Sequence, residues 1–313
     1  MSKNNNGLLG AIAVAGASII ATNKYISEAA KKRHKLDRNI GDTYFYTYGD
    51  VHYTKHGEGK PVLLIHDANN ISSSYEWKRV RLALSNNYTV YSIDLIGSGL
   101  SDKPNLTYTT FMYVELVHNF INDIVKEKVD IITSHDSASI AICFKNMYSD
   151  LCGKLIMINP NDLDKQDMES NQIDMLKKKI LFMPVIGTFF YNMEMQEDLI
   201  KKDLRENYFS NGVNVSKYID AFYEAAHADD SKGRFLYACK KCKYLNINIA
   251  NSLKDKKDIY ILESEDRLKS KKIAETYQKI NKDIKVTYLP GSKLLPQIET
   301  PELVVSNIKR ILK

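Results

Sequence analysis

The sequence predicts an α/β fold built on a doubly wound, mostly parallel sheet. Short apolar runs typical of buried strands alternate with amphipathic helical patterns, as in 61–66 followed by 75–84. This alternation is the pattern of parallel strands joined by crossover helices. In addition, a chain of 313 residues, 44% of them hydrophobic, is large enough to bury one substantial core, or a core and a lid.

The first element expected along the chain is a β-hairpin. Aromatic and polar residues alternate from Thr43 to Thr54 around Gly49-Asp50, which is typical of two short strands joined by a turn. The elements expected after it are strands at 61–66, 88–94, 129–133, 154–160, 258–263 and 284–289, and helices at 75–84, 109–125 and 301–312.

The basic charge of the chain is concentrated near its start. Residues 1–40 hold seven basic and two acidic residues, so they carry +5 of the total net charge of +6. The body is therefore nearly neutral, which gives no indication of a nucleic-acid partner.

The same N-terminal part contains an uncharged apolar run at 7–22. Its 16 residues are close to the lower limit of about 17 for a membrane-spanning helix. Three interpretations are open: a membrane anchor, a cleaved signal peptide, or a helix lying on the body or on a surface. The basic residues follow the run from Lys24 to Arg38, which favours an anchor with the globular domain on the cytoplasmic side. A membrane-associated protein is therefore expected.

The four cysteines give no indication of a metal or a cofactor. Cys239 and Cys242 have the C-x-x-C spacing, but no second cysteine pair or histidine pair accompanies them. A zinc site needs four ligands. We therefore expect no metal and no cofactor, and cysteines that act as small helix residues.

Five motifs follow one another in a fixed order through the body of the chain. They are Leu63–His66, Ser72–Trp77, Asp94–Pro104, Leu155–Pro160 and Leu289–Pro301. In this order and at this spacing, the chain resembles the α/β-hydrolase superfamily over residues 43–313. The most specific match is the D-x-x-G-x-G-x-S turn that begins at Asp94, in which the glycines permit a tight reversal.

The resemblance implies a division into three parts. Residues 1–40 are the apolar segment with its basic linker, and 41–160 with 246–313 form the hydrolase core. Residues 161–245 are then a helical lid inserted after the sixth strand. Within it, the apolar run Met183–Met193 is typical of a helix over a hydrophobic pocket, or of a helix packed on the core without a ligand.

In this family the nucleophile lies at the tip of a strand–turn–helix elbow, which the resemblance places after Val129. Two registers remain open. Alignment without gaps places His135 at the tip. The dipeptide His135-Asp136 instead resembles haloalkane dehalogenases and epoxide hydrolases, in which an aspartate after a histidine is the nucleophile. Both residues are also compatible with a purely structural role in the turn.

The other triad positions agree only in part with the family pattern. Asp266 falls where the acidic member is expected, whereas Leu294 occupies the place of the histidine, and no histidine follows His227. Leucine cannot accept a proton, so it cannot activate a nucleophile or a water molecule. His227, in the segment that resembles the lid, is a candidate base that reaches the elbow from above.

The oxyanion loop departs from the family pattern as well. His66-Asp67 stands where His-Gly is expected, followed by Ala68. The resemblance assigns the loop residues Asp67 and Ala68, together with Ser137 after the elbow, to the oxyanion hole, and it places His66, His227 and Leu294 around the pocket. A carboxylate near a developing negative charge is unfavourable for catalysis.

Two functions are consistent with this sequence. The first is a membrane-tethered, catalytically degenerate member of the superfamily that binds a small apolar ligand or a protein partner. The second is an active hydrolase of ester, epoxide or carbon–halogen bonds that uses Asp136, or a nearby serine, with Asp266 as the acid. The missing histidine favours the first, and the retained Asp266 keeps the second open.

Overall fold

The computed structural model describes residues 3–36 and 38–313, and the side chains from Val14 onward except those of residues 15 and 37. Its centre is an eight-stranded sheet in the order β1-β2-β4-β3-β5-β6-β7-β8. The strands are β1 (Asp42–Tyr46), β2 (Gly49–His56), β3 (Pro61–Ile65), β4 (Thr89–Ile93), β5 (Val129–Ser134), β6 (Cys152–Ile158), β7 (Ile259–Ser264) and β8 (Lys285–Leu289). β2 pairs with β1 and with β4 in antiparallel orientation, and the other five pairs of neighbouring strands are parallel. The predicted fold class is confirmed.

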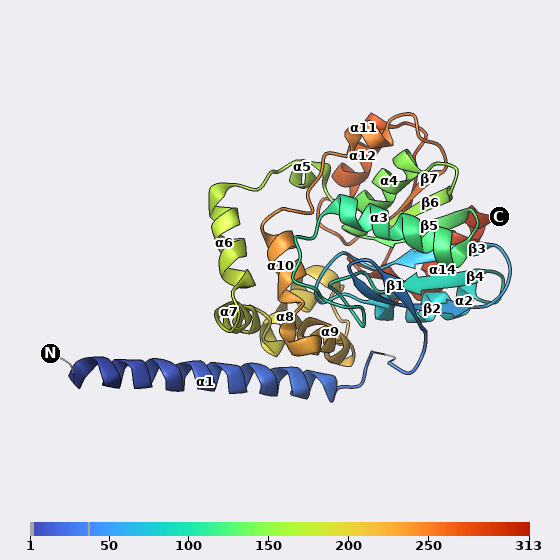
Figure 1. Ribbon diagram of the computed structural model, residues 1–313. Helices are drawn as coiled ribbons and strands as arrows, with labels where there is room; N and C mark the ends of the chain where they lie inside the picture. Colours follow the sequence, from blue (N-terminus) through green and yellow to red (C-terminus); the bar gives the residue numbers. More distant parts are fainter. Residues whose placement is uncertain (1–2, 37) are drawn as a thin grey trace.

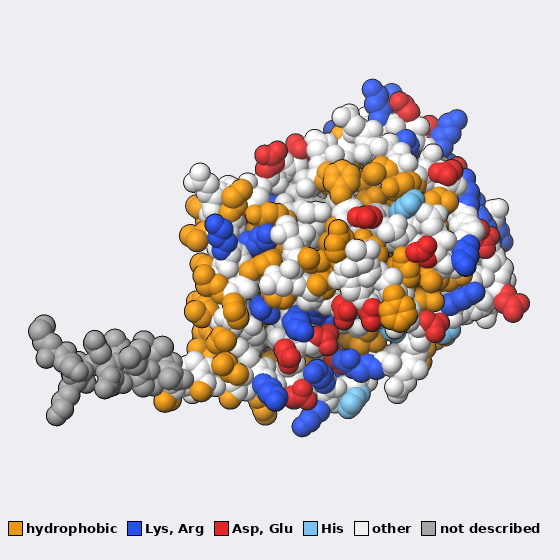
Figure 2. All heavy atoms as spheres, in the orientation of Figure 1, with side chains coloured by type: hydrophobic (Ala, Val, Ile, Leu, Met, Phe, Trp, Pro, Cys, Tyr) orange, Lys and Arg blue, Asp and Glu red, His pale blue; other side chains and the backbone are white. Residues whose placement is uncertain are grey.

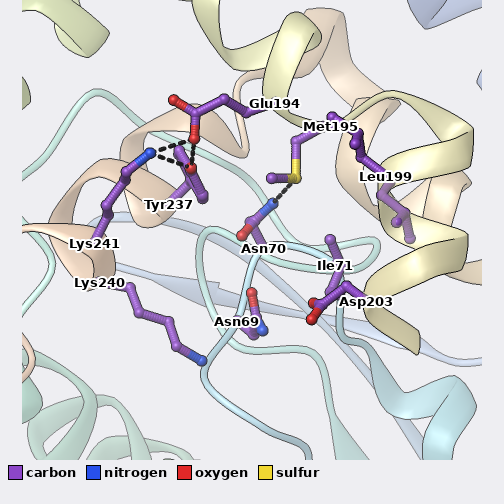
Figure 3. Close-up of a pocket in the computed structure, with 11 residues that line it drawn as sticks. Asn69, Asn70, Ile71, Glu194, Met195, Leu199, Asp203, Tyr237, Lys240 and Lys241 are labelled. Carbon is purple, nitrogen blue, oxygen red and sulfur yellow. Dashed lines mark hydrogen bonds and ion pairs between the residues drawn. The ribbon is translucent and has the colours of Figure 1, made fainter. Parts of the chain in front are cut away.

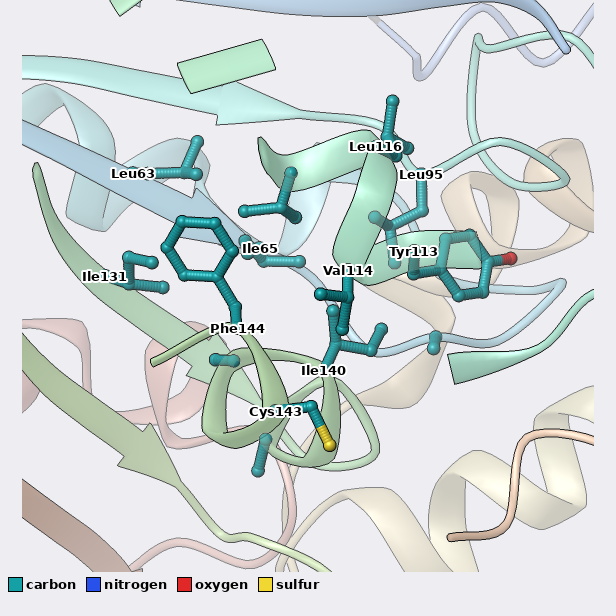
Figure 4. Close-up of a cluster of buried hydrophobic side chains, with 14 of the residues drawn as sticks. Leu63, Ile65, Leu95, Tyr113, Val114, Leu116, Ile131, Ile140, Cys143 and Phe144 are labelled. Atoms are coloured by element: carbon teal, nitrogen blue, oxygen red, sulfur yellow. The ribbon is translucent and has the colours of Figure 1, made fainter. Parts of the chain in front are cut away.

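The side chains of successive residues in the central strands pack into two separate hydrophobic cores, because side chains alternate between the faces of a sheet. Leu63 and Ile65 pack with α3 (Thr110–Phe120) and α4 (Ser137–Met147) in the larger core, part of which Figure 4 shows. Leu64 lies on the other face with Trp77, against α2 (Lys78–Leu84) and α14 (Pro301–Leu312). Helices on both faces explain why these strands are apolar throughout.

The chain between β6 and β7 forms a set of helices, which we call the helical insertion (Figure 1). It contains α5 (Leu163–Gln166), α6 (Gln172–Phe182), α7 (Ile186–Glu194), α8 (Glu197–Asp203), α9 (Ile219–Ser231), α10 (Arg234–Lys241) and α11 (Ala250–Leu253). The helix expected at Met183–Met193 begins only at Ile186, because Pro184 and Val185, whose φ is +63°, interrupt the chain before it. The remaining helices are α12 (Ser270–Ile280) and α13 (Pro296–Glu299).

The chain begins with one long helix, α1 (Lys3–Lys31), which runs beneath the helical insertion (Figure 1). Ser27, Ala30 and Leu36 are buried where this part of the chain meets the body. Among the described residues, no helix combines the length and the apolar character that crossing a membrane requires. Half of the side chains of the predicted anchor at 7–22 lie outside the described part of the chain.

Two basic residues of the segment after the apolar run form ion pairs with the body of the protein. Arg33 pairs with Glu197 and Asp220 at 2.5 Å each, and Arg38 pairs with the fully buried Glu224 at 2.9 Å. These three acids belong to α8 and α9. The segment is therefore attached to the helical insertion.

The glycine-containing turn after β4 is organised by the buried carboxylate of Asp94. Its oxygens accept hydrogen bonds from the backbone amides of Ser74 (2.6 Å) and Leu100 (2.9 Å). A Cβ on Gly99 would lie 2.4 Å from the Asp94 carboxyl carbon, and the φ of Gly99 is +53°. Glycine is therefore required at this position of the predicted motif.

His52 on β2 also binds this carboxylate, through Nδ1 at 3.2 Å, and its Nε2 lies 2.8 Å from the carbonyl oxygen of Ile40. Since both partners can only accept, both ring nitrogens carry protons and the ring is an imidazolium. Burial alone would lower the pKa of His52, but the hydrogen bond to Asp94 and its negative charge raise it overall. Burial acts to raise the pKa of Asp94, but the same contacts hold it well below its usual range.

We expect His52→Gln to be most destabilising in mild acid. The stabilisation by this cation is fully present below the unfolded-state pKa of about 6.5 and is lost as the pH rises through the raised folded-state pKa. The free energy of unfolding of the variant should fall below that of the wild type by about 1 kcal/mol at low pH, and by less in alkali. Urea unfolding across this range measures it, with His118→Gln on α3 as the control. A difference that does not change with pH would contradict the imidazolium assignment.

Candidate active site

The elbow between β5 and α4 has one residue at its tip. β5 ends at Ser134, α4 begins at Ser137, and of the two residues between them only His135 has a positive φ, +48°. Asp136 is already in the right-handed helical conformation. Of the two registers left open by the sequence, the backbone therefore supports the one with His135 at the tip.

His135 is held as a neutral imidazole. Its Nδ1 lies 3.1 Å from the carbonyl oxygen of Asn159, which can only accept, so Nδ1 carries the proton. Burial lowers the pKa of His135, against the opposing charges of Asp136 and Asp67. The unprotonated Nε2 lies 4.0 Å from Oδ1 of Asp136, which is beyond hydrogen-bond distance.

The oxyanion loop places a carboxylate at the elbow. Oδ1 of the buried Asp67 accepts a hydrogen bond from the backbone amide of Asp136 at 3.0 Å. In α/β-hydrolases the amide after the nucleophile is one of the two donors to the oxyanion. Here that donor is occupied by a side chain of the same chain.

The neighbouring residues hold this loop in place. His66 Nδ1 donates to the carbonyl oxygen of Asp67 at 2.7 Å, and Nε2 accepts from the amide of Leu95 at 3.0 Å. Ser137, predicted as part of the oxyanion hole, instead donates its hydroxyl to the carbonyl oxygen of His66. Ala68 is buried beside them. These contacts give the loop a fixed, internally satisfied conformation.

Lys240 of α10 is the functional residue that the sequence analysis missed. Its Nζ lies 3.4 Å from Oδ2 of Asp67 and forms a closer ion pair with Oδ2 of Asp136. Burial would lower the pKa of Lys240, but the two carboxylates raise it overall. Burial in turn acts to raise the pKa of Asp136, which the charge of Lys240 holds below its usual value. Lys240 is therefore a cation and not a general base.

A third acid lies behind this cluster. Glu76 is buried, and burial together with the charge of Asp67 raises its pKa to about 8. Gln297 donates to Oε2 of Glu76 at 3.3 Å and to Oγ of Ser134 at 3.0 Å. At neutral pH Glu76 is thus mainly protonated, and Lys240 has two carboxylates to neutralise rather than three.

The predicted triad members do not meet at the elbow. Leu294 is buried among apolar residues of the helical insertion, and its amide donates to the carbonyl oxygen of Tyr208 at 2.9 Å. Asp266 is exposed and accepts from Ser210 Oγ at 3.1 Å. No hydrogen bond or ion pair found among the described side chains joins either residue to the elbow.

His227, the candidate base predicted to reach the elbow from above, makes its contacts within the helical insertion instead. Its Nδ1 lies 3.1 Å from the carbonyl oxygen of Tyr223, and its ring packs against those of Tyr223 and Tyr191. Burial lowers its pKa to about 4. It is a neutral core residue of α9.

A cavity of about 410 Å³ lies between the oxyanion loop and the helical insertion (Figure 3). Lys240 extends toward Asn69, and Lys241, Glu194 and Tyr237 form a polar cluster above it in this view. The other lining residues are Asn69, Asn70, Ile71, Met195, Leu199, Ile200 and Asp203. Cys239 and Cys242 are free and buried, and the described side chains form no cluster of three or more metal ligands.

The sequence of the chain is similar to those of known proteins. Residues 62–307 match the model of the family described as "Alpha/beta hydrolase family". The chain is 30% identical over 109 residues to the soluble epoxide hydrolase of Corynebacterium sp. (strain C12), covering 35% of the chain and 37% of the relative. It is 37% identical over 59 residues to the haloalkane dehalogenase of Agrobacterium fabrum, covering 19% of each. The matches thus span only about a third or less of these curated relatives.

Solved structures resemble a larger part of the chain. The epoxide hydrolase CorEH without ligand has a TM-score of 0.70 at 18% identity, covering 87% of this chain and 97% of the other. A serine hydrolase involved in carbazole degradation, CarC, has a TM-score of 0.67 at 18% identity, covering 87% and 98%. At this identity the similarity concerns the fold.

Proposed function

The chain belongs to the alpha/beta hydrolase family, and we propose that it is a member that has lost hydrolytic turnover and binds a small apolar ligand in the cavity beneath its helical insertion. The observation that carries the proposal is the hydrogen bond from the Asp136 amide to the Asp67 carboxylate. An anionic transition state needs that amide free, and here it would develop beside a negative charge.

The position of Leu294 supports the same proposal. A hydrolase needs a side chain that accepts a proton from the nucleophile or from water, and a leucine packed in an apolar cluster cannot do this. Lys240, already paired with Asp67 and Asp136, is a protonated cation. The ion pairs of Lys240 therefore stabilise the elbow rather than activate it.

The cavity indicates the kind of ligand. Its volume of about 410 Å³ is within the range of small-molecule sites, about 300–1,000 Å³. Ile71, Leu199 and Ile200 offer an apolar surface, and Asn69 and Asn70 add polar side chains to the lining. This lining suits an apolar molecule with one polar end. A protein partner at this site remains the alternative.

A second candidate is an active hydrolase of ester, epoxide or carbon–halogen bonds. It is favoured by relatives named epoxide hydrolase and haloalkane dehalogenase and by the dipeptide His135-Asp136. Asp136 would have to leave Lys240 to attack a substrate, and the neutral Nε2 of His135, 4.0 Å from Oδ1 of Asp136, would have to act as the base.

We also propose that the apolar run 7–22 tethers the chain to a membrane, with the body on the cytoplasmic side. Support comes from the uncharged run and from the basic residues that follow it.

Hydrolysis is tested with the full chain on short and medium acyl esters, an epoxide and a haloalkane. We expect rates equal to those in buffer for the wild type, Asp136→Asn and His135→Ala alike. Turnover by the wild type that disappears in Asp136→Asn would instead establish the second candidate.

Ligand binding is tested by titration with a dansyl-labelled medium-chain fatty acid. Leu199→Trp narrows the cavity and should weaken binding by about tenfold, equivalent to one lost apolar contact. Leu268→Trp, on an exposed turn after β7, is the matched control and should leave binding unchanged. Equal binding by both variants would place the ligand elsewhere.

A further inference from the structure

An apolar surface covers the outer side of α6 and α7. We call it the insertion face and define it by seven side chains that are 45–64% exposed: Ile173, Met175, Leu176, Met183, Ile186, Phe190 and Met193. Single exposed apolar residues are ordinary. In the described part of the chain, however, seven of the twenty large exposed hydrophobic side chains fall within 173–193, about a fifteenth of the sequence. Figure 2 shows apolar side chains gathered along this edge of the molecule. A concentration of this kind marks an interaction surface.

The helix α1 extends past this face. It is joined to the helical insertion by a hydrogen bond of 2.8 Å between Asn23 and Asn192 of α7, and by one of 3.0 Å between Ser27 and the amide of Asp230. Beyond Asn23, toward the N-terminus, the helix continues outward on the side where α6 and α7 lie (Figure 1). The apolar run 7–22 lies directly before Asn23 on this helix and is about 24 Å long at 1.5 Å per helical residue.

The charges of α6 and α7 that form no ion pair within the protein are of one sign. The acidic residues of α6 and α7 are neutralised within the protein, since Asp174 pairs with Lys243 at 3.0 Å and Glu194 pairs with Lys241. Lys177 and Lys179 of α6 are exposed. The face is therefore apolar with exposed lysines, which is the composition of surfaces that bind anionic lipid headgroups.

We propose that the insertion face rests on an anionic lipid bilayer into which α1 extends, so that α1 and the helical insertion form one membrane-docking surface. The occupant is a bilayer rather than a second copy of the chain, because the face is continuous with an apolar helix directed away from the body. This inference rests on the proposed tether at 7–22 and adds a second contact with the membrane, made by the insertion face.

Docking at this face has a consequence for the ligand. α7 supplies both the exposed residues Ile186 and Phe190 and, at its end, Glu194 and Met195 of the cavity wall. The cavity would therefore lie next to the membrane surface. The ligand class that fits is an amphiphile with an apolar chain that partitions into lipid.

The face and the tether are tested separately in the full-length protein. A single cysteine introduced as Phe190→Cys carries an environment-sensitive dye, and Leu268→Cys is the labelled control, since the four native cysteines are buried. Vesicles are phosphatidylcholine with or without phosphatidylserine. We expect a blue shift of the dye at position 190 on phosphatidylserine vesicles and none at position 268.

Flotation with the same vesicles then separates the two contacts. The tether variant Val14→Glu/Ala17→Glu changes exposed positions of α1, and we expect it to keep weak binding to anionic vesicles. Adding Ile186→Glu/Phe190→Glu should reduce that residual binding by about tenfold or more. Circular dichroism confirms that each variant is folded.

Three results would overturn the proposal. Flotation of the wild type without a dye shift at position 190 would leave a tether but no docking face. A shift that depends on protein concentration and occurs without vesicles would identify a second copy as the occupant. Absence of flotation by the wild type would refute the tether as well as the face.

Discussion

Replacing Lys240 with methionine is expected to lower the free energy of unfolding by about 2–3 kcal/mol at neutral pH. The substitution leaves the carboxylates of Asp67 and Asp136 next to each other without a cation. Removing one partner of a buried ion pair typically costs about 3–5 kcal/mol, and the partial exposure of Lys240, 28% of its side chain, reduces this value. Chemical denaturation of the two proteins measures the difference.

The pH dependence separates this effect from a simple loss of packing. In the wild type the pKa of Asp136 is depressed, so its stabilisation is present above the unfolded-state pKa of about 3.9 and is lost as the pH falls. In the variant the unpaired carboxylates gain stability on protonation. The difference between the proteins should therefore shrink from pH 7 to pH 4.

The adjacent Lys241 provides the matched control. It pairs with Glu194 in an exposed setting, so Lys241→Met should cost less than about 1 kcal/mol. The double variant Lys240→Met/Asp67→Asn should recover part of the loss, because one buried charge is removed. A pH-independent loss in Lys240→Met, or no recovery, would mean that Lys240 does not hold these carboxylates together.

The fold was predictable because its signals are local. The fully apolar β3 and β5, and the glycines of the turn at Asp94, each specify their own segment through burial pattern or backbone conformation. The elbow was located for the same reason. Its register needed the backbone itself, since the sequences around His135 and Asp136 satisfy both alignments.

The composition of the site was less predictable, because its contacts join distant parts of the chain. Lys240 lies between the cysteines of a C-x-x-C segment, and nothing near it in sequence indicates a pairing with Asp67 or Asp136. From sequence, Asp67 was predicted to belong to the oxyanion hole and to be an unfavourable charge there. Its hydrogen bond to the elbow amide depends on the tertiary arrangement of the loop.

The basic segment after α1 shows the same limit. From sequence, the basic residues from Lys24 to Arg38 favoured an anchor with the globular domain on the cytoplasmic side, because positive charge after an apolar run is typical of the cytoplasmic flank of a membrane helix. In the structure the guanidinium groups of Arg33 and Arg38 are paired with acids of the helical insertion. The segment that follows α1 is thereby joined to the helical insertion, and Glu224, one of these acids, is fully buried.

Glu224→Leu is expected to release this segment from α9. The carboxylate accepts hydrogen bonds from the amides of Lys35 (2.7 Å) and Leu36 (3.1 Å) and from Arg38 (2.9 Å). Leucine retains the apolar volume but leaves these donors without an acceptor, at a cost of about 2–3 kcal/mol. The population of the detached segment should rise by about 30–150-fold.

Trypsin reports this change directly, because the segment contains basic cleavage sites from Lys31 to Arg38. Under conditions where reattachment is faster than cleavage, the rate follows the detached population, so cleavage should accelerate by the same factor. Glu28→Leu, which removes only an exposed pair with Lys31, should change it little. Equal cleavage of Glu224→Leu and the wild type would show that Glu224 does not hold the segment, and the coupling of α1 to the helical insertion would then rest on Arg33 and the α1–α9 packing.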